Sequence, residues 1–161
     1  MAVIDNAFET KGTKLYFVNE ASNAVLSVSC PTGITGVAGG TKDQIDTTCL
    51  DETGDVRTSI GGFADATEVQ VPFILYDGDA SHQELFVLKA SGSVRAWMVA
   101  LSDSTTAPTL ASDGLESPTA RTTFKFDAYI SNLTIDAAIN DVVRGTLTLK
   151  PSGQTIAHWA V

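Results

Sequence analysis

The sequence predicts a mainly β protein: an antiparallel β-sandwich or partly closed barrel of about seven strands with one flanking α-helix. Two observations indicate this fold class. Apolar and polar residues alternate with a period of two along most of the chain, which places successive side chains on opposite faces of a sheet. A single segment, near residues 79–92, combines helical spacing with signals for a helix start and end. The 161 residues, 43% of them hydrophobic, suit one domain, residues 1–161, around one core.

The first elements are predicted to be strands. "TKLYFV" and "AVLSVS", separated by the turn-like "NEASN", predict a hairpin over residues 13–30. The glycine-rich "PTGITGVAGGTKD" after them predicts a connection whose backbone must be free to turn. A strand that ends in "IDTTCLD" then leads into a long polar inter-strand loop at about residues 50–65.

"EVQVPFILY" predicts the next strand. Pro72 cannot donate a hydrogen bond to a ladder, so this strand is expected to be an edge strand or to contain a bulge. Its inward face is predicted to carry Val69, Val71, Phe73 and Leu75.

The helix is predicted within "DGDASHQELFVLKASGS". Ser81 with Glu84 three residues later fits a capping box, Lys89 suits the C-terminal end of the helix dipole, and Gly92 can close the helix in a left-handed conformation. The residues expected to face the sheet are Leu85, Phe86, Leu88 and Ala90.

Three further segments predict strands: "SVRAWMVAL", "TARTTFKFDAYI" and "DVVRGTLTLKPS". The alternation in the second places Arg121 and Thr123 on the polar face. The apolar residues of this segment are even-numbered up to Ile130, whereas the next ones, Leu133 and Ile135, are odd-numbered. One extra residue, a β-bulge near Ser131 or Asn132, would keep both sets on the same face. The residues predicted to point inward are Ala120, Phe124, Phe126, Ala128 and Ile130 in the second segment, and Val143, Leu147 and Leu149 in the third.

The sequence offers few groups for chemistry, so we expect no enzyme, no cofactor and no metal. "GVAGGTKD" lacks the Gly-Lys-Ser/Thr ending of a phosphate loop. Cys30 and Cys49 lie too far apart for a short-spaced zinc pair and are expected to be free, small packed residues. His82 and His158 are separated along the chain, and the acidic group Asp51, Glu52 and Asp55 is expected to be a solvated loop. These are expectations from spacing alone.

The net charge of the chain argues against some classes of binding partner. The chain has 10 Lys and Arg against 19 Asp and Glu, a formal net charge of −9, so its average surface repels nucleic-acid phosphates and anionic headgroups. The sequence has no apolar run near the roughly 20 residues that span a bilayer, and its start is not a basic segment followed by an apolar one. We therefore expect a cytosolic protein without a membrane or sequence-specific nucleic-acid partner.

The order of these elements resembles the major tail tube proteins of bacteriophages with long non-contractile tails. The resemblance covers about residues 10–150 and rests on pattern. It runs through the acidic and threonine-containing strand end at residues 46–48, Arg57 in the loop, the step from Gly62 to Asp65, and the short helix of residues 81–90 before another strand.

The resemblance implies a structural protein that assembles into hexameric rings, stacked as the tail tube through which the genome is delivered. It implies self-association and contacts with tape-measure, tail terminator and baseplate or tail-tip proteins, and passage of viral DNA without specific binding. The implied location is the virion tail, with assembly in the host cytoplasm.

The long loop is the candidate interface between rings or subunits. Ile60 and Phe63 are apolar residues that could anchor on a neighbour, and Gly54, Gly61 and Gly62 allow the loop to move. The alternative is an ordinary mobile surface loop. The residues assigned to the candidate interface are Asp46, Thr47, Leu50, Asp51, Arg57, Ile60, Phe63 and Asp65.

Two other functions stay open at this point. One is a tube protein of a bacterial secretion or pyocin-like system, since these share the ring-forming β fold. The other is a ligand-binding β-sandwich module, in which Trp97, Tyr129 or Trp159 would form an exposed stacking platform. Trp97 lies in an alternating strand, which favours a core or interface position for it.

Overall fold

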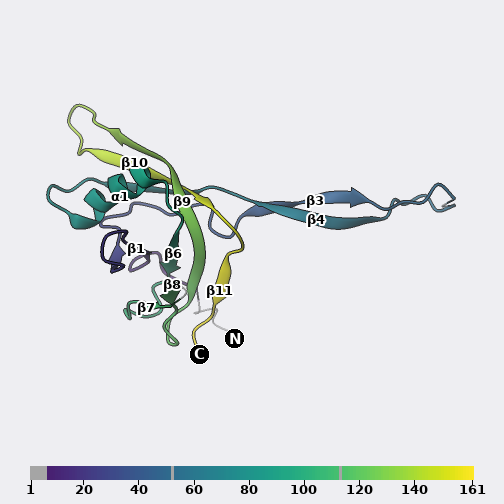
Figure 1. The fold of residues 1–161 in the computed structure, drawn as a ribbon, viewed down its shortest axis with the longest axis horizontal. Helices are drawn as coiled ribbons and strands as arrows, with labels where there is room; N and C mark the ends of the chain where they lie inside the picture. The colour runs from purple at the N-terminus through teal and green to yellow at the C-terminus, as the bar shows by residue number, and fades with distance from the viewer. Residues whose placement is uncertain (1–6, 52, 113) are drawn as a thin grey trace, which may run out of the picture.

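The computed structural model describes residues 7–51, 53–112 and 114–161, and it confirms a mainly β, antiparallel fold with one helix (Figure 1). Six strands form a curved sheet in the order β2-β1-β6-β9-β10-β5, and β11 pairs with β9 beside this path. Two separate hairpins, β3–β4 and β7–β8, complete the described strands. The strands are β1 Lys14–Val18, β2 Val25–Ser27, β3 Gly40–Asp46, β4 Ser59–Ala66, β5 Val69–Ile74, β6 Arg95–Ala100, β7 Thr109–Ala111, β8 Gly114–Glu116, β9 Thr123–Asp136, β10 Arg144–Pro151 and β11 Ile156–His158; the helix is α1 Ala80–Ser91.

Pro72 lies on an edge strand of the main sheet, as predicted. β5 pairs with β10 on one side, and residues 30–35 cover its other side. Thr32 N–H donates to the Pro72 carbonyl at 2.8 Å, and Ile74 N–H donates to the Cys30 carbonyl at 3.1 Å. The chain that leaves β2 at one end of the sheet therefore protects β5 at the other end, and the sheet is partly closed.

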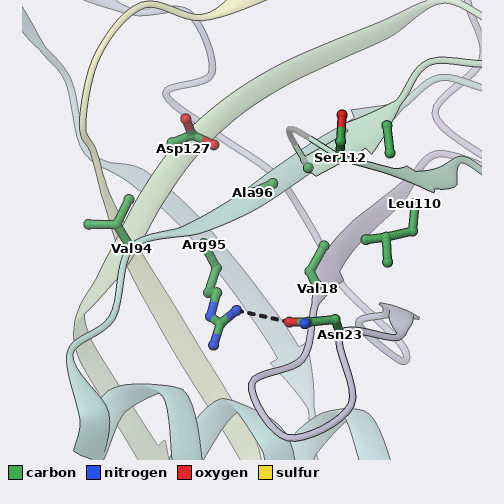
Figure 2. A pocket seen from close by; sticks show the side chains of 10 residues that line it. Val18, Asn23, Val94, Arg95, Ala96, Leu110, Ser112 and Asp127 are labelled. Atoms are coloured by element: carbon green, nitrogen blue, oxygen red, sulfur yellow. Dashed lines mark hydrogen bonds between the residues drawn. The ribbon is translucent and has the colours of Figure 1, made fainter.

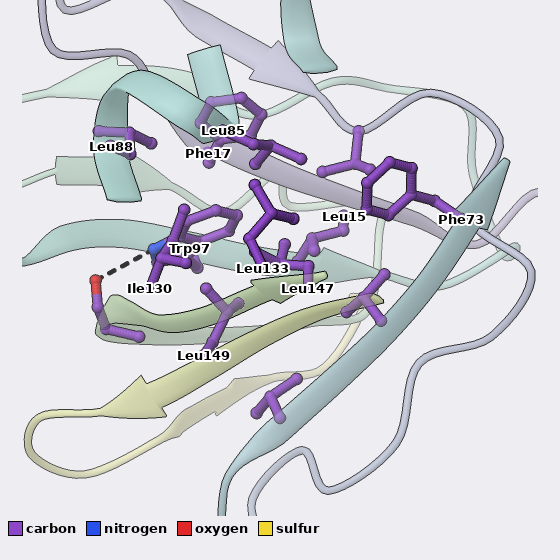
Figure 3. Close-up of a cluster of buried hydrophobic side chains, with 14 of the residues drawn as sticks. Leu15, Phe17, Phe73, Leu85, Leu88, Trp97, Ile130, Leu133, Leu147 and Leu149 are labelled. Atoms are coloured by element: carbon purple, nitrogen blue, oxygen red, sulfur yellow. Dashed lines mark hydrogen bonds between the residues drawn. The ribbon is translucent and has the colours of Figure 1, made fainter. Parts of the chain in front are cut away.

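The main core lies between the sheet and α1 (Figure 3). Trp97 is buried there, stacked on Phe17 with ring centroids 5.0 Å apart, and its Nε1–H donates to the Ala128 carbonyl at 3.1 Å. Trp97 therefore cannot form an exposed binding platform. A smaller cluster on the opposite face, which includes Met98 and Leu115, lies beneath β7–β8. Because β6 is covered on both faces, it is apolar at consecutive positions instead of alternating.

A shallow hollow lies beside β7–β8, between this hairpin and the turn after β1 (Figure 2). Arg95 crosses it: the guanidinium donates to the Asn23 side-chain oxygen at 3.2 Å and lies 3.9 Å from the Glu20 carboxylate. The arginine therefore ties the β1–β2 turn to β6.

The helix has the predicted position, but it begins differently. Its N-cap is Asp79, whose carboxylate accepts from the backbone N–H groups of Ser81 and His82, so the capping box predicted from Ser81 and Glu84 is wrong. The Glu84 carboxylate instead accepts from Glu20 N–H at 2.9 Å. Gly92 ends the helix in the left-handed conformation, as predicted.

Two of the four helix residues predicted to face the sheet do so. Leu85 and Leu88 are buried, whereas Phe86 and Ala90 are exposed. Phe86 is one position from Leu85, and one position turns a side chain by about 100° around the helix. The face of α1 that packs on the sheet is therefore narrower than the sequence predicted.

The predicted β-bulge is present at Ser131. The ladder between β9 and β10 pairs Asn132 with Thr148 and then Ile130 with Leu149, which leaves Ser131 as the extra residue. Phe126, Ala128 and Ile130 before the bulge and Leu133 after it are all buried. The extra residue keeps both halves of β9 facing the core.

Near the ends of strands, the alternation predicted the wrong facing. Arg121 and Thr123 are buried and Ala120 is exposed, whereas Phe124, although only partly buried, packs against the main core as predicted. β9 begins at Thr123, so residues before it do not alternate across a sheet. Val143 is exposed for the same reason, because it precedes β10, whereas Leu147 and Leu149 point inward as predicted.

Arg121 holds several loops together. Its guanidinium donates to the carbonyl oxygens of Leu101 at 2.7 Å, Thr106 at 2.9 Å and Gly12 at 3.1 Å, and to the Tyr16 hydroxyl at 3.3 Å. These contacts satisfy a charge that would be costly to bury alone.

Within the described residues, no helix has the length and apolar character needed to cross a membrane.

Candidate functional site

The β3–β4 hairpin projects as a long arm from the rest of the molecule (Figure 1). We define the arm as residues 40–66. Its ladder runs from Gly40 opposite Ala66 to Asp46 opposite Ser59, and all seven residues of β3 are exposed. A two-stranded hairpin with no further covering is marginally stable in water. The predicted loop at about residues 50–65 is therefore too long: β4 begins at Ser59, and only the segment between Asp46 and Ser59 forms the tip of the arm.

A bulge gives the arm an apolar face. Lys42 pairs with Ala64, whereas Gln44 pairs with Gly61, so both Gly62 and Phe63 stand opposite Asp43. This extra residue brings Phe63 onto the same face as the cross-strand pair Ile45 and Ile60, a face that also carries Asp43. The exposed fractions are 91% for Phe63, 58% for Ile60 and 49% for Ile45.

The tip is held by short-range polar contacts. The Asp46 carboxylate accepts from Thr48 N–H at 2.9 Å, and hydrogen bonds from the Thr48 hydroxyl and amide lower the pKa of Asp46. Thr47 N–H donates to the Thr58 carbonyl at 2.9 Å. Arg57 lies 3.8 Å from the Asp46 carboxylate, but both groups are exposed, so this ion pair adds little stability.

The tip also presents apolar and acidic residues to solvent. Leu50 and Val56 are exposed, and so are Asp51 and Asp55. Glu52, predicted with these two aspartates to form a solvated acidic loop, lies outside the described residues. Cys49 is exposed, so the prediction that it packs as a small buried residue is wrong, whereas Cys30 is partly buried.

The base of the arm depends on two glycines and one lysine. Gly36 and Gly40 have φ angles of +83° and +147°. A Cβ at Gly36 would collide with the Glu68 carbonyl, and one at Gly40 would lie 2.5 Å from the Asp65 carbonyl oxygen. Lys150 Nζ on β10 donates to the Ala66 carbonyl at 3.1 Å and lies 3.9 Å from the Asp65 carboxylate. The glycine-rich connection thus allows close crossing of the chain where the arm leaves the body.

All eight residues assigned to the candidate interface lie on this arm. Ile60, Phe63, Asp46 and Asp65 lie on its strands. Thr47, Leu50, Asp51 and Arg57 lie at its tip. Ile45, which pairs directly with Ile60, was not among the predicted residues, because the bulge and the two adjacent glycines hide the alternation of β4.

The family comparison identifies this architecture. A family model described as "Phage tail tube, TTP, lambda-like" matches residues 6–161. The chain belongs to this family. It is 30% identical over 157 residues to "Structural protein 3" of Pseudomonas phage PAJU2, and the match covers 94% of each chain. This tail tube protein therefore has a structural role in the phage tail.

Solved structures share the fold of this tail tube protein. The SPP1 tail tube protein matches with a TM-score of 0.69 and 12% identity, over 96% of this chain and 81% of that one. The tail of an empty gene transfer agent particle with C6 symmetry matches with a TM-score of 0.66 and 14% identity, over 95% and 100% of the two chains. A chain of the sheath–tube complex of the PVC contractile injection system matches with a TM-score of 0.65 and 16% identity, over 98% and 95%.

Proposed function

We propose that this chain, acting as one domain, assembles into hexameric rings stacked as the tail tube, and that the arm makes the contacts between rings or subunits. The exposed arm with its apolar face carries this proposal. The membership of the tail tube family supports it, and so does the sixfold tail whose fold the chain shares. The role is structural, with no catalytic step.

The energetics favour a covered arm. Fully burying a large apolar side chain stabilises a complex by roughly 1.5–3 kcal/mol, and Phe63 is almost completely exposed in the single chain. The edge groups of β3 and β4 can also pair with a further strand, because an open edge is a template for strand addition. In a ring of identical subunits, every copy would gain these contacts.

The tube would be the conduit for genome delivery. A net charge of −9 suits a wall that DNA passes without binding, because like charges keep a layer of water and counterions between them. The tube would meet a tape-measure protein inside, a terminator at one end and a baseplate or tail-tip complex at the other. Assembly would take place in the host cytoplasm before the tail joins the virion.

An armless variant tests this function. Gly40 and Ala66 face each other across the ladder, so a two-residue Asn-Gly turn can replace residues 41–65 and join them. The body should stay folded, because this deletion removes no residue of either buried cluster. Negative-stain electron microscopy and sedimentation of the concentrated parent should show tubes or rings, and the armless variant should remain monomeric. Tubes of the armless variant would contradict the role of the arm.

A further inference from the structure

A second apolar surface lies at the end of β5 remote from the arm. We call it the distal groove: a hollow of about 390 Å³ whose lining is mainly apolar, with one carboxylate, and includes Leu75, Tyr76, Asp77, Gln83, Phe86 and Val143. Its three large exposed side chains are Tyr76, Phe86 and Val143, with exposed fractions of 53%, 45% and 38%. They come from the β5–α1 loop, from α1 and from the residue before β10.

Buried polar contacts fix the floor of the distal groove. The Nδ1 atom of His82 accepts from Tyr76 N–H at 3.3 Å, and its Nε2–H donates to the Ser29 carbonyl at 3.0 Å. The His82 ring lies parallel to the Tyr76 ring, with centroids 6.5 Å apart. Leu75 N–H donates to the Val143 carbonyl at 3.0 Å, which holds the two sides together. The apolar surface is therefore preorganised, which lowers the entropic cost of docking.

The fold separates the arm from the distal groove. β5 begins three residues after the arm ends and runs for six residues, about 20 Å, to the groove. The arm points away from α1 and from the turn between β9 and β10 (Figure 1). The arm of one chain therefore cannot cover its own groove.

We propose that the apolar face of the arm, Ile45, Ile60 and Phe63, docks on the distal groove of a second copy of this chain. This inference rests on the proposed tube function and names the surface that receives the arm. Two different surfaces at opposite ends make a head-to-tail contact, which repeats without limit or closes into a ring. Either result is a way to build a tube from one kind of subunit.

The apolar residues supply more than half of the area of a specific contact. If a large side chain presents about 150–250 Å² when fully exposed, the exposed parts of the three arm residues and of Tyr76, Phe86 and Val143 come to roughly 600 Å². The rest of the ~1,000 Å² that a specific interface needs would come from polar atoms around this apolar centre. The anchors are aromatic on both sides, as is common at the centre of interfaces.

Disulfide cross-linking tests the contact. In a Cys30→Ser, Cys49→Ser background, Asp43→Cys is combined with Gln83→Cys, which keeps every apolar anchor on both surfaces; Asp43 stands opposite Phe63 on the arm and Gln83 lines the groove. The matched control combines Asp43→Cys with Val87→Cys, because Val87 is also exposed on α1 but does not line the groove. Tubes are oxidised and then analysed by denaturing, non-reducing electrophoresis. We expect a ladder of covalent multimers from the Gln83→Cys pair and at least fivefold less from the control.

Two results would overturn the inference. Tubes that form but give no Gln83→Cys ladder, or an equally strong Val87→Cys ladder, would place the arm elsewhere and leave the tube function standing. If the cysteine-free parent forms no tubes or rings at any concentration, the proposed function itself fails, and the docking inference fails with it.

Discussion

Replacing Phe126 by alanine should destabilise the fold strongly. This residue on β9 is 2% exposed and stands opposite Trp97 of β6 in the main core. The substitution removes roughly 130 Å² of buried apolar surface, worth about 3 kcal/mol, and the cavity left behind adds to this cost. We expect a loss of about 3–5 kcal/mol, which for a chain of this size lowers the Tm by roughly 6–20 °C.

The measurement is best made on the armless variant, because self-association would otherwise couple stability to concentration. Urea and thermal unfolding would be followed by circular dichroism. Phe86→Ala is the matched control, since this aromatic side chain lies half-exposed on the opposite side of the core layer, and it should cost less than half as much. A Phe126→Ala variant whose Tm lies within about 2 °C of the parent's would refute the placement of the Phe126 side chain in the main core.

Three further substitutions test other parts of the structure. Arg121→Met should cost about 3 kcal/mol, because it leaves buried carbonyl oxygens without donors; an unchanged urea midpoint would contradict this. Hydrogen bonds from the hydroxyls of Ser29 and Ser81 lower the pKa of Asp79 to about 2. The folded pKa lies below the unfolded one, so this contribution is present above about pH 4 and is lost between about pH 4 and 2. Asp79→Asn should therefore make Tm fall less steeply between about pH 4 and 2. An unchanged dependence of Tm on pH would show that Asp79 does not contribute to stability in this way. Phe63→Asp should abolish tubes while changing monomer stability by less than about 0.5 kcal/mol, and persistent tubes would argue against the apolar contact.

Features that depend on neighbouring residues could be predicted from the sequence. The left-handed Gly92, the edge position of Pro72 and the bulge at Ser131 each follow from one residue type or one change of parity. The eight residues proposed for the interface all lie on one structural unit, the arm, and their role in contacts stays a prediction. The form of the arm was not predicted, since β3 and β4 are polar and glycine-rich and do not alternate against a core of their own.

Contacts between distant residues could not be predicted in this way. Arg121 looks like a surface residue of an alternating strand, yet its acceptors include Gly12, which is 109 positions away. Glu84 looks like part of a capping box, yet it binds the backbone of Glu20. In both cases the polar side chain binds a residue far away in the sequence, and only the folded structure brings the two together.

The sequence by itself determined the class of fold, the position of the helix α1 and the segment that we propose for contacts between subunits, because backbone periodicity and turn chemistry act between close neighbours in the chain. The tertiary structure decided that this region is a projecting hairpin with one apolar face and that an apolar groove lies at the other end of β5. Register and burial depend on which distant segments meet, so neither can be settled before the chain is folded.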